Sequence, residues 1–437
     1  MPIKDGCETT MSKQVVQQLV QALPEGLARV DADDFVWFGP TEAAALATLL
    51  QTAGQYPGLT LMPDLGQPIE TDRRWSVLPV SWELLNEIVR LRADEYLITV
   101  QPGMTVGEMN RILAPHRQRL GTLYPSSRTL LSLIGQDLPC LTQGSVGSFR
   151  QQVTGIKALT GAGEPFKYGG EVVKNVTGYD MVALLVGSRH QYGLPVEVTL
   201  KTVPIPEMER RLVIDLQPVD ETALPSTPAL MSTFVDEIKN LQAELNTLKG
   251  IALFRLRASI GWKCLLDCGG WRNTVQPDME RLQAWVQALD ARGPGLHELD
   301  CEASAFDHWL DKLDWQRPGQ SYNLVLKVAL PTAQAREFLV GFATADWFDA
   351  ADCLWYPDAG VMYLRWRSPN YPYSAELETI VEWVEQHHDG LVTLAVRPVN
   401  IDLPDTLAQP KEPEAFERWR YRLRQLYDPN GLLGPPV

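Results

Sequence analysis

Hydrophobic and polar positions along the first half of the chain predict a mixture of helices and strands. Apolar residues recur at helical spacing over residues 15–23, and an alanine- and leucine-rich stretch predicts a second helix over residues 41–53. Residues 75–121 alternate in a way that predicts strand, helix, strand and helix. Further strands are expected over residues 155–160 and 194–204. This alternation is typical of an α/β or α+β domain.

The pattern changes near residue 208, where we expect a domain border. Pro204 and Pro206 precede it, and two prolines so close together continue neither a strand nor a helix. Residues 323–398 then follow the order strand, helix, strand, strand, helix, strand, which is the order of a ferredoxin-like unit. Residues 210–298 follow the same order more loosely. The second domain is therefore predicted to be α+β.

Composition and charge narrow the function classes. The 437 residues are 45% hydrophobic and 21% charged, which predicts a globular protein. The net charge of -15 argues against nucleic acid as a general partner. The N-terminal residues lack the apolar core of a secretory signal, and no apolar run approaches the length of a membrane span. Because six cysteines are scattered along a long chain, reduced thiols and a cytoplasmic location are expected.

A glycine-rich bend, GGEVVKNVTGYD, spans residues 169–180 between two apolar runs. Its glycines allow backbone conformations that other residues avoid and let the chain approach a ligand closely. Lys174 and Asn175 stand beside them with side-chain donors, and such a bend can present backbone N–H groups to a phosphate. Taken alone, the segment is better explained as a decorated turn between two strands.

The neighbouring residues carry a resemblance. Residues 147–188, GSFRQQVTGIKALTGAGEPFKYGGEVVKNVTGYDMVALLVGS, followed by GLPVEVTLKTVPIP, resemble the flavin domain of the vanillyl-alcohol-oxidase-type (PCMH-type) FAD proteins. Within that family they are most similar to the E-type subunit of bacterial glycolate oxidase. YLITVQPGMTVGEMNRIL, residues 96–113, resembles the family's strand, Pro-Gly turn and helix, and LYDPNGLLGPP, residues 426–436, resembles its usual ending.

This resemblance implies a fold, a cofactor and partners. It implies a PCMH-type FAD-binding domain of two α+β subdomains over residues 1–208, a ferredoxin-like cap domain over residues 209–410, and a C-terminal segment, residues 411–437, that returns to the flavin domain. It implies non-covalent FAD, oxidation of a 2-hydroxy acid by hydride transfer to the flavin, and assembly with a second flavin subunit and an iron–sulfur subunit. No catalytic residue and no metal ligand is assigned. The residues that the resemblance assigns to the cofactor are Gly66, Gly147, Ser148, Val153, Lys174, Asn175, Gly178, Tyr179, Asp180, Gly187, Ser188 and Gly193.

The chain departs from the family pattern at three glycine loops. The first loop, usually a glycine run, is MPDLGQP at residues 62–68, where a proline lacks an N–H and an aspartate would repel a phosphate. In the second loop, Leu131 and Ser132 stand where a glycine pair is expected. In the third, RHQYG at residues 189–193 replaces Gly-Thr-Leu-Gly, and His190 replaces a glycine. Arg189 and Arg128 are candidate substitutes for the lost phosphate donors.

Two functions remain open on these residues. The first is an FAD-linked oxidoreductase subunit that binds FAD through a rearranged backbone. The second is a flavin-free structural or regulatory subunit, which keeps the fold and holds a catalytic flavin subunit and an iron–sulfur subunit together. The loop at residues 63–67 is the feature that separates them.

Two other patterns have plain structural explanations. Cys264 and Cys268 could form a metal pair on a helix, but the surrounding GWKCLLDCGG favours a strand that carries ordinary thiols. The thirteen tryptophans are concentrated in the second domain, where we expect more of them in the core than on a partner surface.

Overall fold

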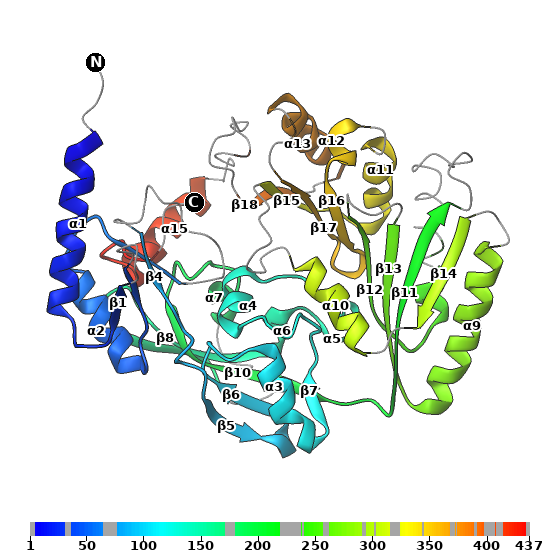
Figure 1. Ribbon diagram of the computed structural model, residues 1–437, viewed down its shortest axis with the longest axis horizontal. Helices are drawn as coiled ribbons and strands as arrows, with labels where there is room; N and C mark the ends of the chain where they lie inside the picture. Colours follow the sequence, from blue (N-terminus) through cyan, green and yellow to red (C-terminus); the bar gives the residue numbers. More distant parts are fainter. Residues whose placement is uncertain are drawn as a thin grey trace.

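The structure is a computed structural model, and it combines three β-sheets with helices packed against them (Figure 1). It describes residues 5–30, 36–63, 77–170, 180–218, 237, 240–256, 262–290, 294–300, 303–314, 324–342, 345–367, 372, 374–388, 391–396, 407 and 414–433. Within these ranges, none of the helices combines the length and the apolar character that a membrane-crossing segment needs.

The N-terminal subdomain is a four-stranded sheet in the order β1-β2-β4-β3, with β2, β4 and β3 parallel. Both predicted helices are present, and the second ends at Gly54 as expected, although Gly54 has a right-handed conformation. The core between helices and sheet is apolar, with Leu46, Leu61 and Val80 fully buried. The elements of this subdomain are α1 (Asp5–Ala22), β1 (Ala28–Val30), β2 (Val36–Phe38), α2 (Ala43–Ala53), β3 (Thr60–Pro63) and β4 (Val77–Val80).

The second subdomain is an antiparallel sheet in the order β5-β6-β10-β8-β9, with β7 paired to the far end of β10. Its elements as far as residue 159 are β5 (Ile88–Arg92), β6 (Leu97–Val100), α3 (Val106–Leu113), β7 (Gln118–Leu120), α4 (Leu130–Gln136), α5 (Gln143–Val146), α6 (Phe149–Gln152) and β8 (Val153–Leu159). Those after it are β9 (Pro165–Gly169), α7 (Val182–Leu185) and β10 (Leu194–Pro204), with short 3-10 turns η2 (Ala93–Glu95) and η3 (Ala114–His116) before β6 and β7.

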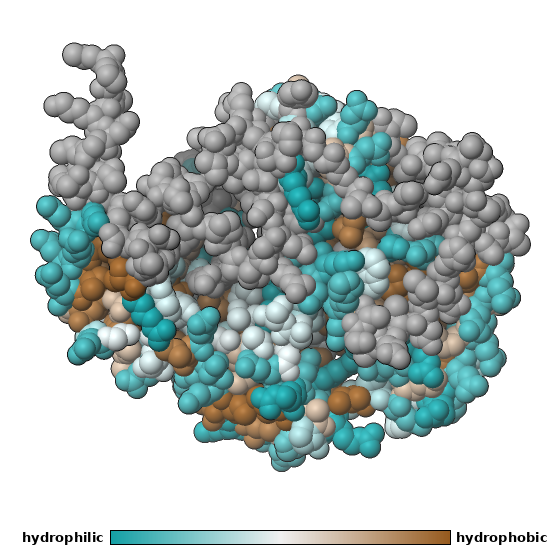
Figure 2. All heavy atoms as spheres, viewed as in Figure 1, coloured by the Kyte–Doolittle hydropathy of each residue, from teal (hydrophilic) through white to brown (hydrophobic). Residues whose placement is uncertain are grey.

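One predicted helix in this subdomain is wrong. The segment between β4 and β6 was expected to be helical, but its second half forms the edge strand β5, paired with β6. Ile88 and Val89 are β-branched, which favours extended backbone, and the helical spacing of their apolar neighbours was coincidental. Both side chains are about two-fifths exposed (43% and 44%), and hydrophobic side chains lie along the lower edge of the molecule in Figure 2, where β5 runs.

The predicted strand, Pro-Gly turn and helix at residues 96–113 is confirmed as β6, a turn and α3. Thr105 caps α3 by accepting a hydrogen bond from the Glu108 N–H at 3.2 Å, and the Glu108 carboxylate accepts one from the Thr105 N–H at 2.9 Å. This reciprocal pair satisfies two N–H groups that the helix itself leaves unpaired.

The cap domain is an eight-stranded sheet made of two ferredoxin-like halves. The strand order β14-β11-β13-β12-β16-β17-β15-β18 is that of two four-stranded units, each with its first strand between its third and fourth. Strands β12 and β16 join the halves. The predicted ferredoxin-like cap and its looser first copy are both confirmed. The expected border near residue 208 lies where β11 begins, and the bounds of the three predicted segments stay predictions.

The bounds of the first half are β11 (Met208–Pro218), β12 (Leu248–Arg255), β13 (Trp262–Gly270), α9 (Arg272–Asp290) and β14 (Pro294–Asp300), with residues 240–244 helical between β11 and β12. Helix α10 (Ala303–Leu313) connects the halves and was not predicted. The second half has β15 (Leu324–Ala329), α11 (Thr332–Phe342), α12 (Asp346–Asp349), β16 (Asp352–Tyr356), η4 (Pro357–Ala359), β17 (Val361–Trp366), α13 (Ser374–His388) and β18 (Leu391–Val396).

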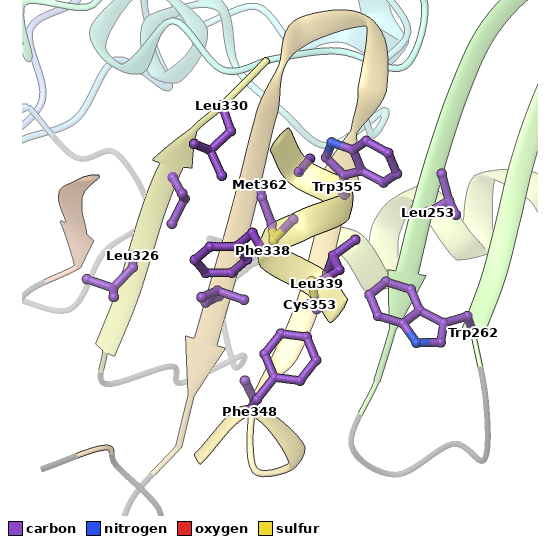
Figure 3. Packing of buried hydrophobic residues seen from close by; sticks show 14 of the residues in the cluster. Leu253, Trp262, Leu326, Leu330, Phe338, Leu339, Phe348, Cys353, Trp355 and Met362 are labelled. Atoms are coloured by element: carbon purple, nitrogen blue, oxygen red, sulfur yellow. The ribbon is translucent and has the colours of Figure 1, made fainter. Parts of the chain in front are cut away.

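The two faces of the cap sheet differ in what covers them. On one face, helices including α11 and α13 enclose a large apolar cluster that contains Trp262, Trp355 and Phe338 (Figure 3). On the other face, Phe254 and Leu354 pack against α10 and against Leu141 of the second subdomain. The second face is thus the one that meets the flavin half of the molecule.

Most tryptophans of the cap belong to its core, as expected. Trp262, Trp355 and Trp366 are almost completely buried, whereas Trp271 is 72% exposed. Cys264 and Cys268 both lie in β13, so the strand interpretation is confirmed. Burial raises the pKa of the Cys268 thiol to about 12, which keeps it in the protonated form.

The C-terminal residues contact both subdomains of the flavin half. Helix α15 (Glu414–Tyr427) precedes a turn in which both oxygens of Asp428 accept backbone N–H bonds, from Leu432 at 2.8 Å and from Leu433 at 2.9 Å. Leu433 then forms a parallel bridge with Leu61 of β3, and the hydroxyl group of Tyr427 hydrogen bonds that of Tyr168.

Candidate functional site

The described part of the glycine-rich bend is held tightly against strand β8. Gly169 has φ +69°, and a Cβ atom at this position would lie 2.0 Å from the Thr154 carbonyl oxygen. The Gly170 N–H donates to the same oxygen at 3.0 Å. Position 169 therefore requires glycine for both conformation and space.

Five of the predicted cofactor residues lie outside the described residues. They are Gly66, Lys174, Asn175, Gly178 and Tyr179.

Three of the other predicted residues, Gly147, Ser148 and Gly187, lie close to α4. Gly147 (φ +85°) and Ser148 precede α6, whose Arg150 reaches across to the Val186 carbonyl oxygen at 3.1 Å. The next residue, Gly187, has φ +89° and donates its N–H to the Ile134 carbonyl oxygen of α4 at 2.7 Å. The structure thus brings residues 147–150 and 187–188 together, as the sequence pattern suggested.

The remaining predicted residues have local structural roles. The Ser188 hydroxyl donates to the Leu185 carbonyl oxygen at 2.8 Å, and Val153 is buried in the core of the second subdomain. Asp180 is exposed and accepts a hydrogen bond from the Ala183 N–H at 3.3 Å. Gly193 has φ +148°, a conformation that favours glycine.

The N-terminus of α4 corresponds to the second glycine loop. The Leu130 and Leu131 N–H groups donate to the carbonyl oxygens of Met104 and Pro102, at 3.0 and 2.8 Å. The Ser132 N–H donates to the Thr129 hydroxyl oxygen at 3.3 Å. All three first-turn N–H groups therefore already have protein acceptors. Leu131 is buried among side chains of the N-terminal subdomain and fills the space that glycine would leave.

The third loop is a strained turn that fills space with a histidine ring. Arg189 and His190 have φ +51° and +64°, the left-handed region that glycine adopts more readily. The His190 ring is 2% exposed, and its Nε2 lies 3.1 Å from the Leu131 carbonyl oxygen. A carbonyl can only accept, so Nε2 carries the hydrogen. Burial lowers the pKa of His190 to about 4, so the ring is neutral at pH 7.

The close contact between the second and third loops leaves no spare volume at this point. A Cβ atom at Gly135 would lie 2.6 Å from Nε2 of His190. The Arg189 N–H donates to the Gly135 carbonyl oxygen at 2.8 Å. The C-terminal half of α4 and the turn at residues 187–190 are therefore packed directly on one another.

A buried ion pair connects the flavin half to the cap. Arg128, just before α4, pairs with Asp314, which follows α10, and both side chains are almost completely buried (6% and 2% exposed). Arg128 is thus committed to this pair and does not replace a lost phosphate donor. Two tyrosines of the cap sheet, the partly buried Tyr356 and the buried Tyr363, lie in the same region, and their pKa values are raised chiefly by desolvation.

Comparison with known proteins identifies the class of fold. Residues 40–169 match the family described as FAD binding domain. The structure superposes on p-cresol methylhydroxylase with a TM-score of 0.68, at 14% identity, covering 99% of this chain and 98% of that one. A 4-ethylphenol oxidase from Gulosibacter chungangensis gives a TM-score of 0.64 at 13% identity, with 99% and 98% covered. The fold is that of the PCMH-type flavoproteins.

Sequence relatives narrow the class. The chain is 27% identical over 215 residues to glycolate oxidase subunit GlcD of Bacillus subtilis, covering 47% of this chain and 45% of the relative. It is 30% identical over 141 residues to glycolate oxidase subunit GlcE of Escherichia coli, covering 32% and 38%. The match thus spans less than half the length of these relatives. The chain thus contains a match to an FAD binding domain within a PCMH-type fold, and in sequence it is similar to glycolate oxidase subunits.

The comparisons support FAD as the cofactor, but the described residues do not provide the glycine cradle for its diphosphate. A diphosphate needs backbone N–H groups that point at it without intervening side chains. At the second loop these N–H groups are bonded within the protein, and Leu131 and His190 occupy the space. The central part of the first loop, residues 64–67, lies outside the described residues. We therefore derive no chemical step from bound FAD.

Sequence analysis missed Lys327 and Asp314, which come from the cap. Lys327 is the only charged residue among the six of β15, LVLKVA, and a lysine in so apolar a strand was the available signal. No pattern in the sequence marks Asp314 as a site residue, because only the tertiary structure places it against Arg128.

Proposed function

We propose that the chain is the E-type, flavin-fold subunit of a multi-subunit oxidoreductase that oxidises a small 2-hydroxy acid. The observation that carries this proposal is that a PCMH-type fold covers 99% of the chain, while its sequence is similar to glycolate oxidase subunits and matches an FAD binding domain at residues 40–169. A flavin, held by this chain or by a partner subunit, would supply the two-electron chemistry that converts a 2-hydroxy acid to a 2-oxo acid. We assign neither base nor hydride position to a residue.

A second candidate function is a flavin-free subunit of such a complex. The observation that favours it is the direct contact between His190 and Leu131, which fills the second and third loops with side chains. In this case the catalytic flavin would belong to a partner subunit, and the chain would hold that subunit in place.

Helix α15 is a surface that supports assembly with a partner. Trp419 and Leu426 lie on the same side of the helix, two turns apart, and are 63% and 68% exposed. Arg418 and Arg422 flank them, so this helix is basic within a chain of net charge -15. Exposed tryptophan and arginine are typical of interface centres. We propose that another subunit of the complex, with acidic residues around an apolar groove, binds here. The iron–sulfur partner and the cytoplasmic location stay predictions.

The test is the spectrum of the purified protein. If the chain binds FAD, the protein alone shows the visible flavin absorption band, or acquires saturable flavin binding on titration with FAD. The addition of glycolate to the assembled complex then bleaches that band. Absence of both the band and saturable binding would remove the first function for this chain. The flavin-free function is contradicted if stoichiometric FAD is found in the chain alone.

Co-purification tests assembly separately. A Trp419→Ala variant is expected to lose its co-expressed partner subunits, while a Trp271→Ala variant, equally exposed but in the cap, retains them. Retention by both variants would contradict α15 as the partner surface.

A further inference from the structure

Three buried polar atoms at the C-terminal end of α4 and on the neighbouring α6 have no hydrogen-bond partner among the described residues. They are Oε1 of Gln136, Oδ1 of Asp137 and Nε of Arg150. The other carboxylate oxygen of Asp137 accepts a hydrogen bond from Nη2 of Arg150 at 2.8 Å, so the two side chains lie together. An unpaired buried polar atom is destabilising, and a group of them indicates a missing polar ligand or water.

Strand β15 of the cap brings a cation to the same place. Lys327 lies between Leu326 and Val328, which point into the helix-covered core, so its own side chain points to the opposite face. It is directly opposite Tyr363 on β17. Leu138, the residue after Asp137, packs against this face in the cluster that contains Tyr363. Lys327 therefore faces the end of α4 across the junction between the cap and the flavin half.

The local charge at this junction is positive. Burial is the main cause of the lowered pKa of Lys327; Asp137 raises that pKa, while Arg150 and Arg189 lower it. Three cations thus act around one carboxylate. An anion would relieve the mutual repulsion of the cations and would accept hydrogen bonds from them.

The unpaired acceptors specify the ligand further. Oδ1 of Asp137 and Oε1 of Gln136 can only accept, so they require a ligand that donates a hydrogen bond. The diester diphosphate of FAD and a sulfate ion have no hydrogen to donate. A 2-hydroxycarboxylate has a carboxylate for the cations and a neighbouring hydroxyl group for the acceptors.

We propose that this junction is a binding site for a small 2-hydroxycarboxylate. Lys327 and Arg150 hold the carboxylate, the ligand hydroxyl donates to Asp137 or Gln136, and Arg189 contributes positive charge. The proposal rests on the proposed function for its reaction class and deepens it by naming the residues that select the substrate.

Isothermal titration of the full chain, without added FAD, tests the site directly. Glycolate is the probe, acetate is the matched anion without a hydroxyl group, and sulfate is the general anion. We expect glycolate to bind about tenfold more tightly than acetate, because one buried hydrogen bond is lost with acetate. A Lys327→Gln variant should bind glycolate about tenfold more weakly than the wild type. A Lys167→Gln variant, which changes an exposed lysine of β9, should bind it normally.

A second variant tests recognition of the ligand's hydroxyl group separately from recognition of its carboxylate. Gln136→Met removes an acceptor without changing the charge, so it should reduce the preference for glycolate over acetate while leaving acetate binding unchanged. Circular dichroism of each variant confirms that it is folded.

Several results would overturn the site. They are no binding of glycolate, equal binding of glycolate and acetate, competition by sulfate or FAD at concentrations similar to glycolate, or unchanged affinity in Lys327→Gln. Failure of this site and failure of the proposed function are distinguishable. Glycolate binding without any flavin in the chain would support the site and remove only the chain's own flavin chemistry.

Discussion

The imidazole Nε2 of His190 donates a hydrogen bond to the carbonyl oxygen of Leu131 at 3.1 Å, and this bond joins the two positions at which the flavoprotein pattern has glycines. Two loops that leave room for a dinucleotide in the family thus contact each other here. The two loops therefore pack on each other instead of facing a cofactor. Because His190 is buried at this contact, the folded protein holds its ring in the neutral form.

The first prediction concerns pH. The pKa of His190 is about 4 in the folded protein and about 6.5 when exposed, so between these values the unfolded chain binds more protons. The free energy of unfolding should therefore fall as pH decreases from 6.5 to 4, by about 3 kcal/mol from this residue.

The measurement is urea denaturation of the wild type and of His190→Gln across this pH range. The other five histidines are present in both proteins, so the difference between the curves isolates His190. A pH-independent difference would show that His190 is not buried in neutral form.

The second prediction is that opening the two loops increases FAD affinity. The double variant Leu131→Gly/His190→Gly removes both obstructing side chains, and glycine also suits the left-handed conformation at residue 190. FAD titration should show binding about tenfold tighter or more than in the wild type, because the two side chains no longer exclude the dinucleotide; tenfold corresponds to about 1.4 kcal/mol. Loss of a buried leucine should also lower stability by about 2–5 kcal/mol.

The control for this variant is Leu133→Gly/His190→Gly. Leu133 is equally buried on α4 but belongs to the core of the second subdomain. If both double variants gain FAD affinity equally, general loosening rather than loop opening is the cause.

The third prediction concerns the ion pair between Arg128 and Asp314. Removing one partner leaves a buried charge uncompensated, so Arg128→Met or Asp314→Leu alone should lower the free energy of unfolding by about 3–5 kcal/mol. The double variant should recover most of this loss, because neither charge then remains buried. Chemical denaturation of the four proteins gives the coupling energy. Additive effects of the two substitutions would contradict the pairing.

The fourth prediction tests the glycine-rich bend. Gly169→Ala meets both an unfavourable φ of +69° and a Cβ contact at 2.0 Å with the Thr154 carbonyl oxygen. Gly58 has a similar φ of +85° but open space around it, so Gly58→Ala is the matched control. We expect about 1 kcal/mol of destabilisation in the control and about 1–3 kcal/mol more in Gly169→Ala. Thermal denaturation measures both, and equal effects would mean that strand β9 yields to the extra methyl group.

Local patterns in the sequence were sufficient for most elements and for the cap topology. The alternation in β15 to β18 and the amphipathic helices between them are set by neighbouring residues, so the ferredoxin-like order could be predicted. The pattern failed between β4 and β6, where pairing with β6 decided in favour of a strand. It also gave no indication of α10, which connects the two halves of the cap.

The sequence by itself determined the class of fold, the glycine turns and the departures at Leu131 and His190. Only the tertiary structure decided what those departures do, because the contact between residues 131 and 190 spans 59 positions of the chain. The same holds for the junction of Asp137, Arg150 and Lys327. Burial and charge at such a site arise from three segments that meet only when the cap packs on the flavin half, and no local pattern encodes their distance.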